Sequence, residues 1–257
     1  MKHMLRFTGA LLLITAGLST QLPAQEDSVP GAAKVEPGAT QALDRMGAYL
    51  RTLKAFQVQT RGTSEIVMPD GQKVQLSQTT NLLARMPDKL MADINGDRGS
   101  KLYLFDGQTF TLFARDAGYY ATAAVPGTLR QLVDILADKY DIEIPLVDLF
   151  LWGAPNNTPP KLTSAIDIGP TEVDGVSCEH YAFRQEGLDW QVWIQQGDYP
   201  LPRKLVLTTL TDDARPQHTS ILTWNLAPSY NEAAFTFTPP PDTHKIDFAP
   251  NAQSGKH

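Results

Sequence analysis

The sequence predicts an α+β fold in which a single curved antiparallel sheet forms an unclosed β-barrel covered by lid helices. Three observations favour this fold class. Long stretches of the 257 residues alternate between apolar and polar side chains, as half-buried strands do. Two segments have the helical period instead, and Asp-Gly turns separate several of the strand-like runs. The pattern is too irregular to predict a barrel with every edge closed.

The N-terminus resembles an export signal. Lys2 and Arg6 begin it, and an apolar run from Phe7 to Leu18 follows that is too short to span a bilayer comfortably. We expect residues 1–24 to be a signal peptide that is cleaved near Ala24, which would place the protein in the periplasm. An uncleaved anchor is the alternative.

Composition limits the partners that the exported chain can have. Removing residues 1–24 leaves 20 basic and 28 acidic residues, a net charge of −8. This charge argues against nucleic acid and anionic membrane surfaces as partners. Cys178 is the only cysteine, so an intramolecular disulfide is excluded. We expect a monomer.

The predicted domain follows a flexible linker. Residues 25–38 are rich in Pro, Gly and Ala and have no period, whereas residues 39–250 carry the strand and helix patterns. Residues 251–257 are predicted to be a disordered tail.

The first predicted element is a helix over about 40–54 with Thr40 as its N-cap. Leu43, Met46, Leu50 and Leu53 recur in it at helical spacing. The alternating runs that follow predict five strands, over 55–68, 73–86, 89–96, 100–107 and 108–116.

The middle of the chain returns to the helical period. After Pro126, the apolar residues from Leu129 to Tyr140 fall on one helix face, and a second short apolar segment covers 144–152. We expect the two segments, over about 126–152, to be lid helices. Five more strands are predicted over 163–173, 175–185, 188–196, 202–211 and 217–226, and a last short strand over 234–239 precedes a loose Pro-rich tail.

Asp70-Gly71, Asp106-Gly107 and Asp174-Gly175 each lie between two strand-like runs. Asp-Gly favours the tight turns of β-hairpins, so we interpret these aspartates as turn residues and not as metal or acid–base groups.

Two tryptophans three residues apart in one predicted strand must point to opposite faces of the sheet. Trp190 shares a face with Val192 and Ile194, the face that we expect the helices to cover. Trp193 is expected to lie flat on the other face against Lys204 or Arg184. The alternative is that Trp193 marks a contact site for a partner protein.

The sequence contains few residues in arrangements typical of catalytic or metal-binding sites. Cys178 and His180 point the same way on a strand, but a thiol–imidazole pair lacks a third orienting group nearby in sequence. The same two residues are too few for a zinc site, and there is no Gly-rich phosphate loop, G-x-S-x-G elbow or H-E-x-x-H motif. The sequence therefore predicts no enzyme, no cofactor and no metal site.

Several segments together resemble a family of uncharacterised predicted periplasmic proteins that is defined by a domain of unknown function. They are RMPDKL with INGD at 85–97, LYLFDGQTFTLF, PLVDLFLW, GVSCEHYAFR, DWQVWI, PLPRKLVLT and FTFTPPPDTHKI, and they extend over about 40–250. That family is similar in fold to the lipoprotein carrier LolA and the receptor LolB.

This resemblance implies an unclosed β-barrel whose helices form a lid over an apolar cavity that holds acyl chains. No arginine here aligns with the one that locks the lid of the carrier, so the resemblance implies binding of a hydrophobic ligand or lipid and not lipoprotein transport.

The inner apolar face has two interpretations that the sequence leaves open: a core filled by helix side chains, or a ligand cavity. An envelope sensor that binds a partner protein through the convex face is the alternative function. The candidate cavity residues are Tyr103, Phe105, Phe110, Leu112, Leu132, Leu136, Leu149, Phe150, Tyr181, Phe183, Trp190 and Val192.

Overall fold

The computed structural model describes residues 34–142, 144 and 161–249, which belong to one compact unit. Its first half begins with a helix, and six strands follow before the second helix, α2 (Leu129–Tyr140). These elements are α1 (Pro37–Thr52), β1 (Ala55–Val67), β2 (Lys73–Arg85), β3 (Lys89–Gly96), β4 (Gly99–Phe105), β5 (Thr109–Ala114) and β6 (Tyr119–Ala124).

The second half adds six strands and one short 3-10 helix. They are β7 (Ser164–Val173), β8 (Val176–Gln185), β9 (Leu188–Gln195), β10 (Pro202–Thr209), β11 (Gln217–Asn225), the 3-10 helix η1 (Glu232–Phe235) and β12 (His244–Ile246).

All twelve described strands belong to one sheet with the order β12-β6-β5-β4-β3-β2-β1-β11-β10-β9-β8-β7. Neighbours are antiparallel except for β12, which pairs in parallel with β6. β7 and β12 do not pair with each other, so the sheet is not closed. The predicted fold class, an unclosed sheet with helices, is confirmed.

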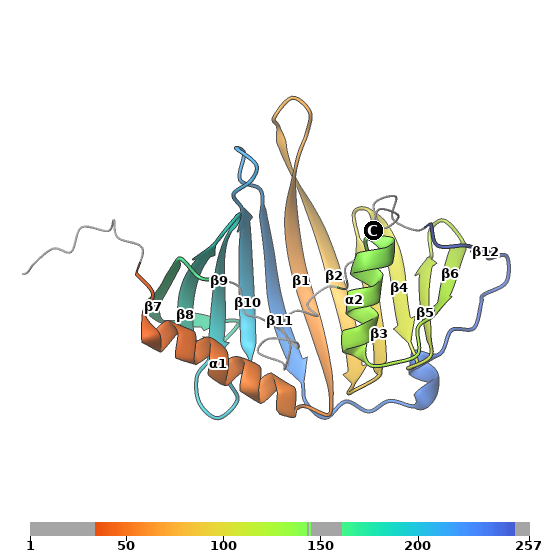
Figure 1. The fold of residues 1–257 in the computed structure, drawn as a ribbon, viewed down its shortest axis with the longest axis horizontal. Helices are drawn as coiled ribbons and strands as arrows, with labels where there is room; N and C mark the ends of the chain where they lie inside the picture. Colours follow the sequence, from red (N-terminus) through yellow and green to blue (C-terminus); the bar gives the residue numbers. More distant parts are fainter. Residues whose placement is uncertain (1–33, 143, 145–160, 250–257) are drawn as a thin grey trace, which may run out of the picture. The chain divides into compact units, whose positions relative to one another are not determined.

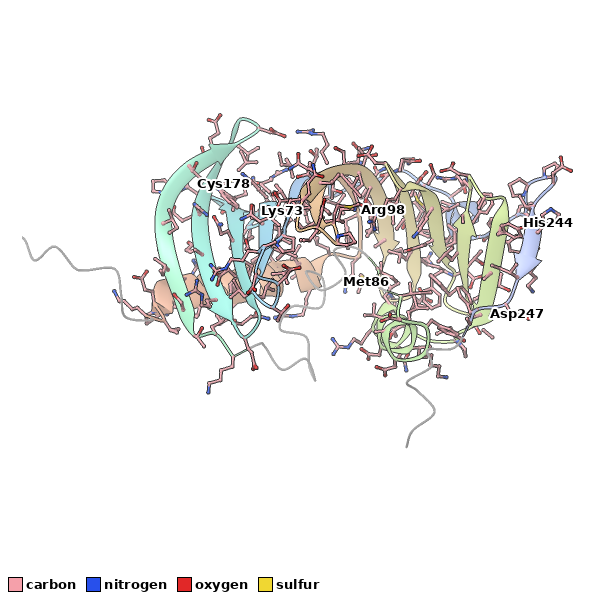
Figure 2. The ribbon with its side chains drawn as sticks, turned by 90° about the horizontal axis from the view of Figure 1, so that it is seen from above. Lys73, Met86, Arg98, Cys178, His244 and Asp247 are labelled. Atoms are coloured by element: carbon pink, nitrogen blue, oxygen red, sulfur yellow. The ribbon has the colours of Figure 1, made fainter. Side chains whose placement is uncertain are left out.

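Both helices lie on the same face of the sheet, which we call the inner face. α1 runs across the strands from β7 to β11, and α2 lies over β3 and β4 (Figure 1). The view from above also places both helices on one side (Figure 2). One continuous apolar core joins side chains of α1, α2 and the inner face, including the fully buried Met46, Leu132 and Phe56.

Helix α1 starts three residues before the predicted position. Glu36 is the N-cap, without a side-chain cap bond, and Pro37 occupies the first helical turn, where its missing N–H is not needed. Thr40 lies inside the helix and donates its hydroxyl to Pro37 O at 3.0 Å, so Thr40 is not the N-cap. The last residues assigned to the linker also belong to the folded unit, because Val35 pairs with Ala165.

Helix α2 follows the prediction closely. Thr128 caps it, with its side chain accepting from Gln131 N while the Gln131 side chain accepts from Thr128 N at 2.8 Å. This reciprocal arrangement is a capping box, which fixes the start of a helix. The predicted segment over 144–152 lies outside the described residues, apart from Ile144.

The three Asp-Gly pairs form the predicted turns, between β1 and β2, between β4 and β5, and between β7 and β8. Asp174 and Gly175 both have positive φ, 49° and 78°, as the primed hairpin turn requires. Asp106 also accepts hydrogen bonds from Gln108 N and Thr109 N, so its carboxylate stabilises its own turn.

The prediction missed β6 and β12 and misassigned one segment between them. β6 is rich in alanine and tyrosine and was not recognised. Residues 234–239 do not form a strand: η1 ends there, and Phe237 packs on the outer face against Phe113 and Tyr120, with ring centroids 5.4 Å and 5.0 Å apart. Residues 234 and 235 belong to η1, and the residues that follow pack on the sheet without pairing within it.

The chain then continues around the β6 edge. β12 pairs with β6, with His244 beside Tyr119, and Figure 2 shows His244 at this edge of the sheet. Phe248 reaches the inner side, where its ring stacks on that of Phe110 with centroids 5.9 Å apart. The described part of the Pro-rich tail, up to residue 249, is therefore tied to the sheet and is not loose. Among the described residues, no helix combines the length and apolar character that crossing a membrane requires.

Gly96 is expected to be essential for the close approach of β2 and β3. A Cβ at this position would lie 2.7 Å from Ser77 O and 2.8 Å from Gln78 Cβ, and both atoms are held by the ladder. We expect Gly96→Ala to lower the free energy of unfolding by about 1–3 kcal/mol in urea denaturation, as overpacking does.

The matched control is Gly38→Ala in α1, where nothing lies within 4 Å of the added Cβ. Alanine favours the helix over glycine, so this variant should be neutral or up to about 1 kcal/mol more stable. Equal stability of the two variants would contradict the packing argument.

Candidate functional site

Of the twelve predicted cavity residues, the ten that the structure describes all belong to the inner apolar core. Leu112 is partly buried against this core, and the others are buried. Leu149 and Phe150 lie outside the described residues. The ten are contributed by four strands and α2: Tyr103, Phe105, Phe110, Leu112, Leu132, Leu136, Tyr181, Phe183, Trp190 and Val192.

The strand residues among them form two groups. In the first group Tyr103 pairs with Leu112 and Phe105 with Phe110, on β4 and β5. In the second group Tyr181 pairs with Val192 and Phe183 with Trp190, on β8 and β9. Five strands, β3, β2, β1, β11 and β10, separate the two groups.

Aromatic rings concentrate at both ends of the inner face. In the first group, Phe110 contacts Tyr103 edge-on with centroids 5.9 Å apart, and Phe248 lies between Phe110 and Tyr140 of α2. In the second group, Phe183 stacks on Trp190 at 4.3 Å. Burial raises the pKa of the Tyr103 hydroxyl, so this group stays protonated.

The strands between the two groups supply further apolar residues that the sequence-based selection missed. They lie on the inner face by register, and the alternation of β1, β2 and β11 is the signal that could have found them. They are Phe56, Val58, Leu82, Leu90, Leu222 and Trp224. One apolar cluster therefore extends across the inner face from one aromatic group to the other.

The middle of this face also carries a group of polar residues that the sequence did not reveal. Ser64 Oγ lies 2.7 Å from His218 Nδ1, and His218 Nε2 lies 2.8 Å from Ser220 Oγ. A neutral imidazole has one N–H donor and one acceptor nitrogen. One serine therefore accepts a hydrogen bond from the ring and the other donates one to it.

Burial lowers the pKa of His218, so the ring is neutral in the folded protein near neutral pH. Neutral hydroxyls occupy both ring nitrogens, and no carboxylate orients the ring as in a Ser-His-Asp triad. The arrangement is suited to hydrogen bonding more than to activation of a nucleophile.

Trp193, the second tryptophan of β9, packs against side chains of the outer face. Trp193 stacks on His180 with ring centroids 3.9 Å apart, and Lys204 Nζ lies 4.4 Å from the ring centroid. The predicted contact with Lys204 is confirmed, whereas Arg184 pairs with Asp189. Trp193 is only 9% exposed, so the chain's own side chains cover the surface proposed for a partner.

Cys178 and His180 lie on this outer face but form separate hydrogen bonds. The Cys178 thiol donates to Val176 O at 3.3 Å, and His180 Nε2 pairs with Gln191 Oε1 at 3.0 Å. Burial raises the pKa of the thiol, which is the opposite of what a reactive cysteine needs.

The outer face also has an open hollow of about 540 Å³ over β1, β2, β3 and β11. Most of the residues that line it are polar, including Arg61, Thr79 and Asp97. Within the described ranges, no group of three or more His, Cys, Asp or Glu side chains could hold a metal ion.

Comparison with protein families identifies the chain. The model of the family described as predicted periplasmic protein (DUF2092) matches residues 39–249. The chain belongs to this family. The predicted resemblance to a periplasmic family of unknown function is thus confirmed. A comparison with curated proteins finds no match.

Solved structures similar to this DUF2092 protein include an uncharacterized conserved protein from Thermus thermophilus, at 9% identity and a TM-score of 0.48, covering 82% of this chain and 99% of that one. Mycobacterium tuberculosis lipoprotein LppX is 12% identical with a TM-score of 0.47, covering 76% and 100%. A LolA superfamily protein from Nitrosomonas europaea is 10% identical with a TM-score of 0.36, covering 77% and 97%. Similarities of this size carry no conclusion about a ligand.

Two partly buried histidines predict how the stability of this DUF2092 protein depends on pH. Burial is the main cause that lowers the pKa of both His180 and His218. Below about pH 6.5 the unfolded chain takes up protons that the folded chain does not. The free energy of unfolding should therefore decrease as the pH decreases below this value. His218→Gln should make the melting temperature less dependent on pH between about pH 6.5 and 5.

The control is His244→Gln, which makes the same change at an exposed position. An unchanged pH dependence in His218→Gln, measured by thermal denaturation, would contradict the assignment of a partly buried, neutral imidazole.

Proposed function

We propose that this protein is a non-enzymatic periplasmic binding protein that holds a hydrophobic or amphipathic molecule, such as a lipid or an acyl chain, against the inner face of its sheet. The observation that carries the proposal is the apolar cluster that joins two aromatic groups across the inner face, which is covered by two helices and not by a second sheet. The export signal predicted for residues 1–24 and the periplasmic description of the family support the location.

Burial of an acyl chain supplies enough free energy for such a role. A buried methylene contributes about 0.8 kcal/mol, so a chain of about 14 carbons contributes on the order of 11 kcal/mol before ordering costs. A charged anchor is therefore not needed for useful affinity.

The lid hypothesis remains part of the proposal, with α2 as the described part of the lid. Leu136 is fully buried in the core. Its truncation would cost about 2–5 kcal/mol of stability, so Leu136→Ala does not separate ligand uptake from folding as a lid test requires.

A first test is direct. The protein purified gently from its native envelope should contain a stoichiometric apolar molecule, detected by mass spectrometry of an organic extract. A ligand-free protein that also ignores added fatty-acid probes would mean that side chains fill the core completely, and the proposal would fail.

The two tryptophans of β9 give a second test with an internal control. Trp190 lies on the inner face and Trp193 on the outer face. Bromine atoms on a bound acyl chain should quench the fluorescence of Trp190 and leave that of Trp193 unchanged.

We therefore expect Trp193→Phe to keep the full quenched signal and Trp190→Phe to lose part of it in a titration with brominated fatty acid. Quenching that disappears in Trp193→Phe would place the acyl chain on the outer surface instead.

A further inference from the structure

The polar residues in the middle of the inner face form a defined group that apolar binding does not use. By register, six residues of three adjacent strands share this position, and we call them the polar island. They are Thr60 and Ser64 of β1, Gln78 and Thr80 of β2, and His218 and Ser220 of β11. Val58, Leu82 and Leu222 border the island on the same face.

Gly62, which has no side chain, lies between members of the polar island on the inner face. Gly62 pairs with Gln78 on one side and Ser220 on the other. A Cβ at Gly62 would lie 3.2 Å from Thr219 O, 3.4 Å from Ser220 Oγ and 3.7 Å from Gln78 Cγ. The absence of a side chain at Gly62 therefore lets the Ser220 and Gln78 side chains lie close together on this face.

Thr80 is the second observation that indicates a ligand. It is only 2% exposed, and its hydroxyl has no hydrogen-bond partner. Buried hydroxyls are nearly always paired, so an unpaired one calls for an explanation. The neighbouring serines are paired through His218, and each keeps further hydrogen-bonding capacity: a free O–H on one and free lone pairs on the other.

Charge defines the chemical class of the ligand. The described inner-face residues of β11, β1, β2 and β3 include no Asp, Glu, Lys or Arg. A charged head group would be buried here without a counter-ion, which is costly. Hydroxyl and ester oxygens instead match the donors and acceptors of the island.

We propose that the polar island binds the uncharged, oxygen-bearing head group of an amphipathic lipid whose acyl chain lies on the adjoining apolar face. This inference rests on the proposed function and adds the class of head group. The Thr80 hydroxyl gains its missing partner when the ligand is bound.

The test compares three brominated probes of equal chain length by quenching of Trp190: a monoacylglycerol, a fatty acid and a hydrocarbon. We expect the monoacylglycerol to bind most tightly. Thr80→Val should weaken monoacylglycerol binding roughly fivefold to tenfold, as loss of one hydrogen bond does, and leave hydrocarbon binding unchanged. Valine keeps the shape of threonine, so the melting temperature should not fall.

Thr63→Val is the matched control, because it makes the same change on the outer face of β1. Tighter binding of the fatty acid than of the monoacylglycerol, or an unchanged monoacylglycerol affinity in Thr80→Val, would overturn the head-group assignment and leave the proposed function standing. Absence of binding by all three probes would overturn both.

Discussion

The antiparallel pairing of β1 with β11 is the constraint on which the rest of the structure depends. β1 to β6 and β7 to β11 are each built from strands consecutive in sequence, and this pairing joins them into one sheet. A slip of one residue would send the apolar side chains of one strand to the outer face, so the core itself fixes the register. The same register pairs Ser64 with His218. It also places the rings of Phe56 and Trp224 with their centroids 5.7 Å apart.

A single-layer sheet leaves the chain with two faces to satisfy by different means. Two helices and the start of the tail cover the inner face, whereas polar side chains such as Gln59 and Arg61 of β1 occupy much of the outer face. Where the outer face is apolar, at β8 to β10, Trp193 is covered by His180 and Lys204. The two tryptophans of β9 thus serve separate clusters, and only the cluster of Trp190 connects to the helices.

Local patterns predicted the fold well because most of its pairings are local. Alternation identified ten of the strands, and the Asp-Gly turns connected three pairs of them. β6 was not predicted because its alanines give weak alternation. Residues 234–239 were mistaken for a strand because Phe235 of η1 and Phe237 are two residues apart, the spacing of a strand. The apolar site residues followed from alternation too. The Ser64–His218 contact did not, because it joins residues 154 positions apart through a register that no local pattern specifies.

The polar island also shows where packing and binding place different demands on one position. Thr80 and valine have nearly the same shape, and an unpaired buried hydroxyl costs about 1–3 kcal/mol. For a core that only had to fill space, valine would be the more stable choice at the centre of this sheet. Sites at which a sequence departs from the most stable choice are where function is expected, and Thr80 is such a departure, with its hydroxyl buried in the core and unpaired.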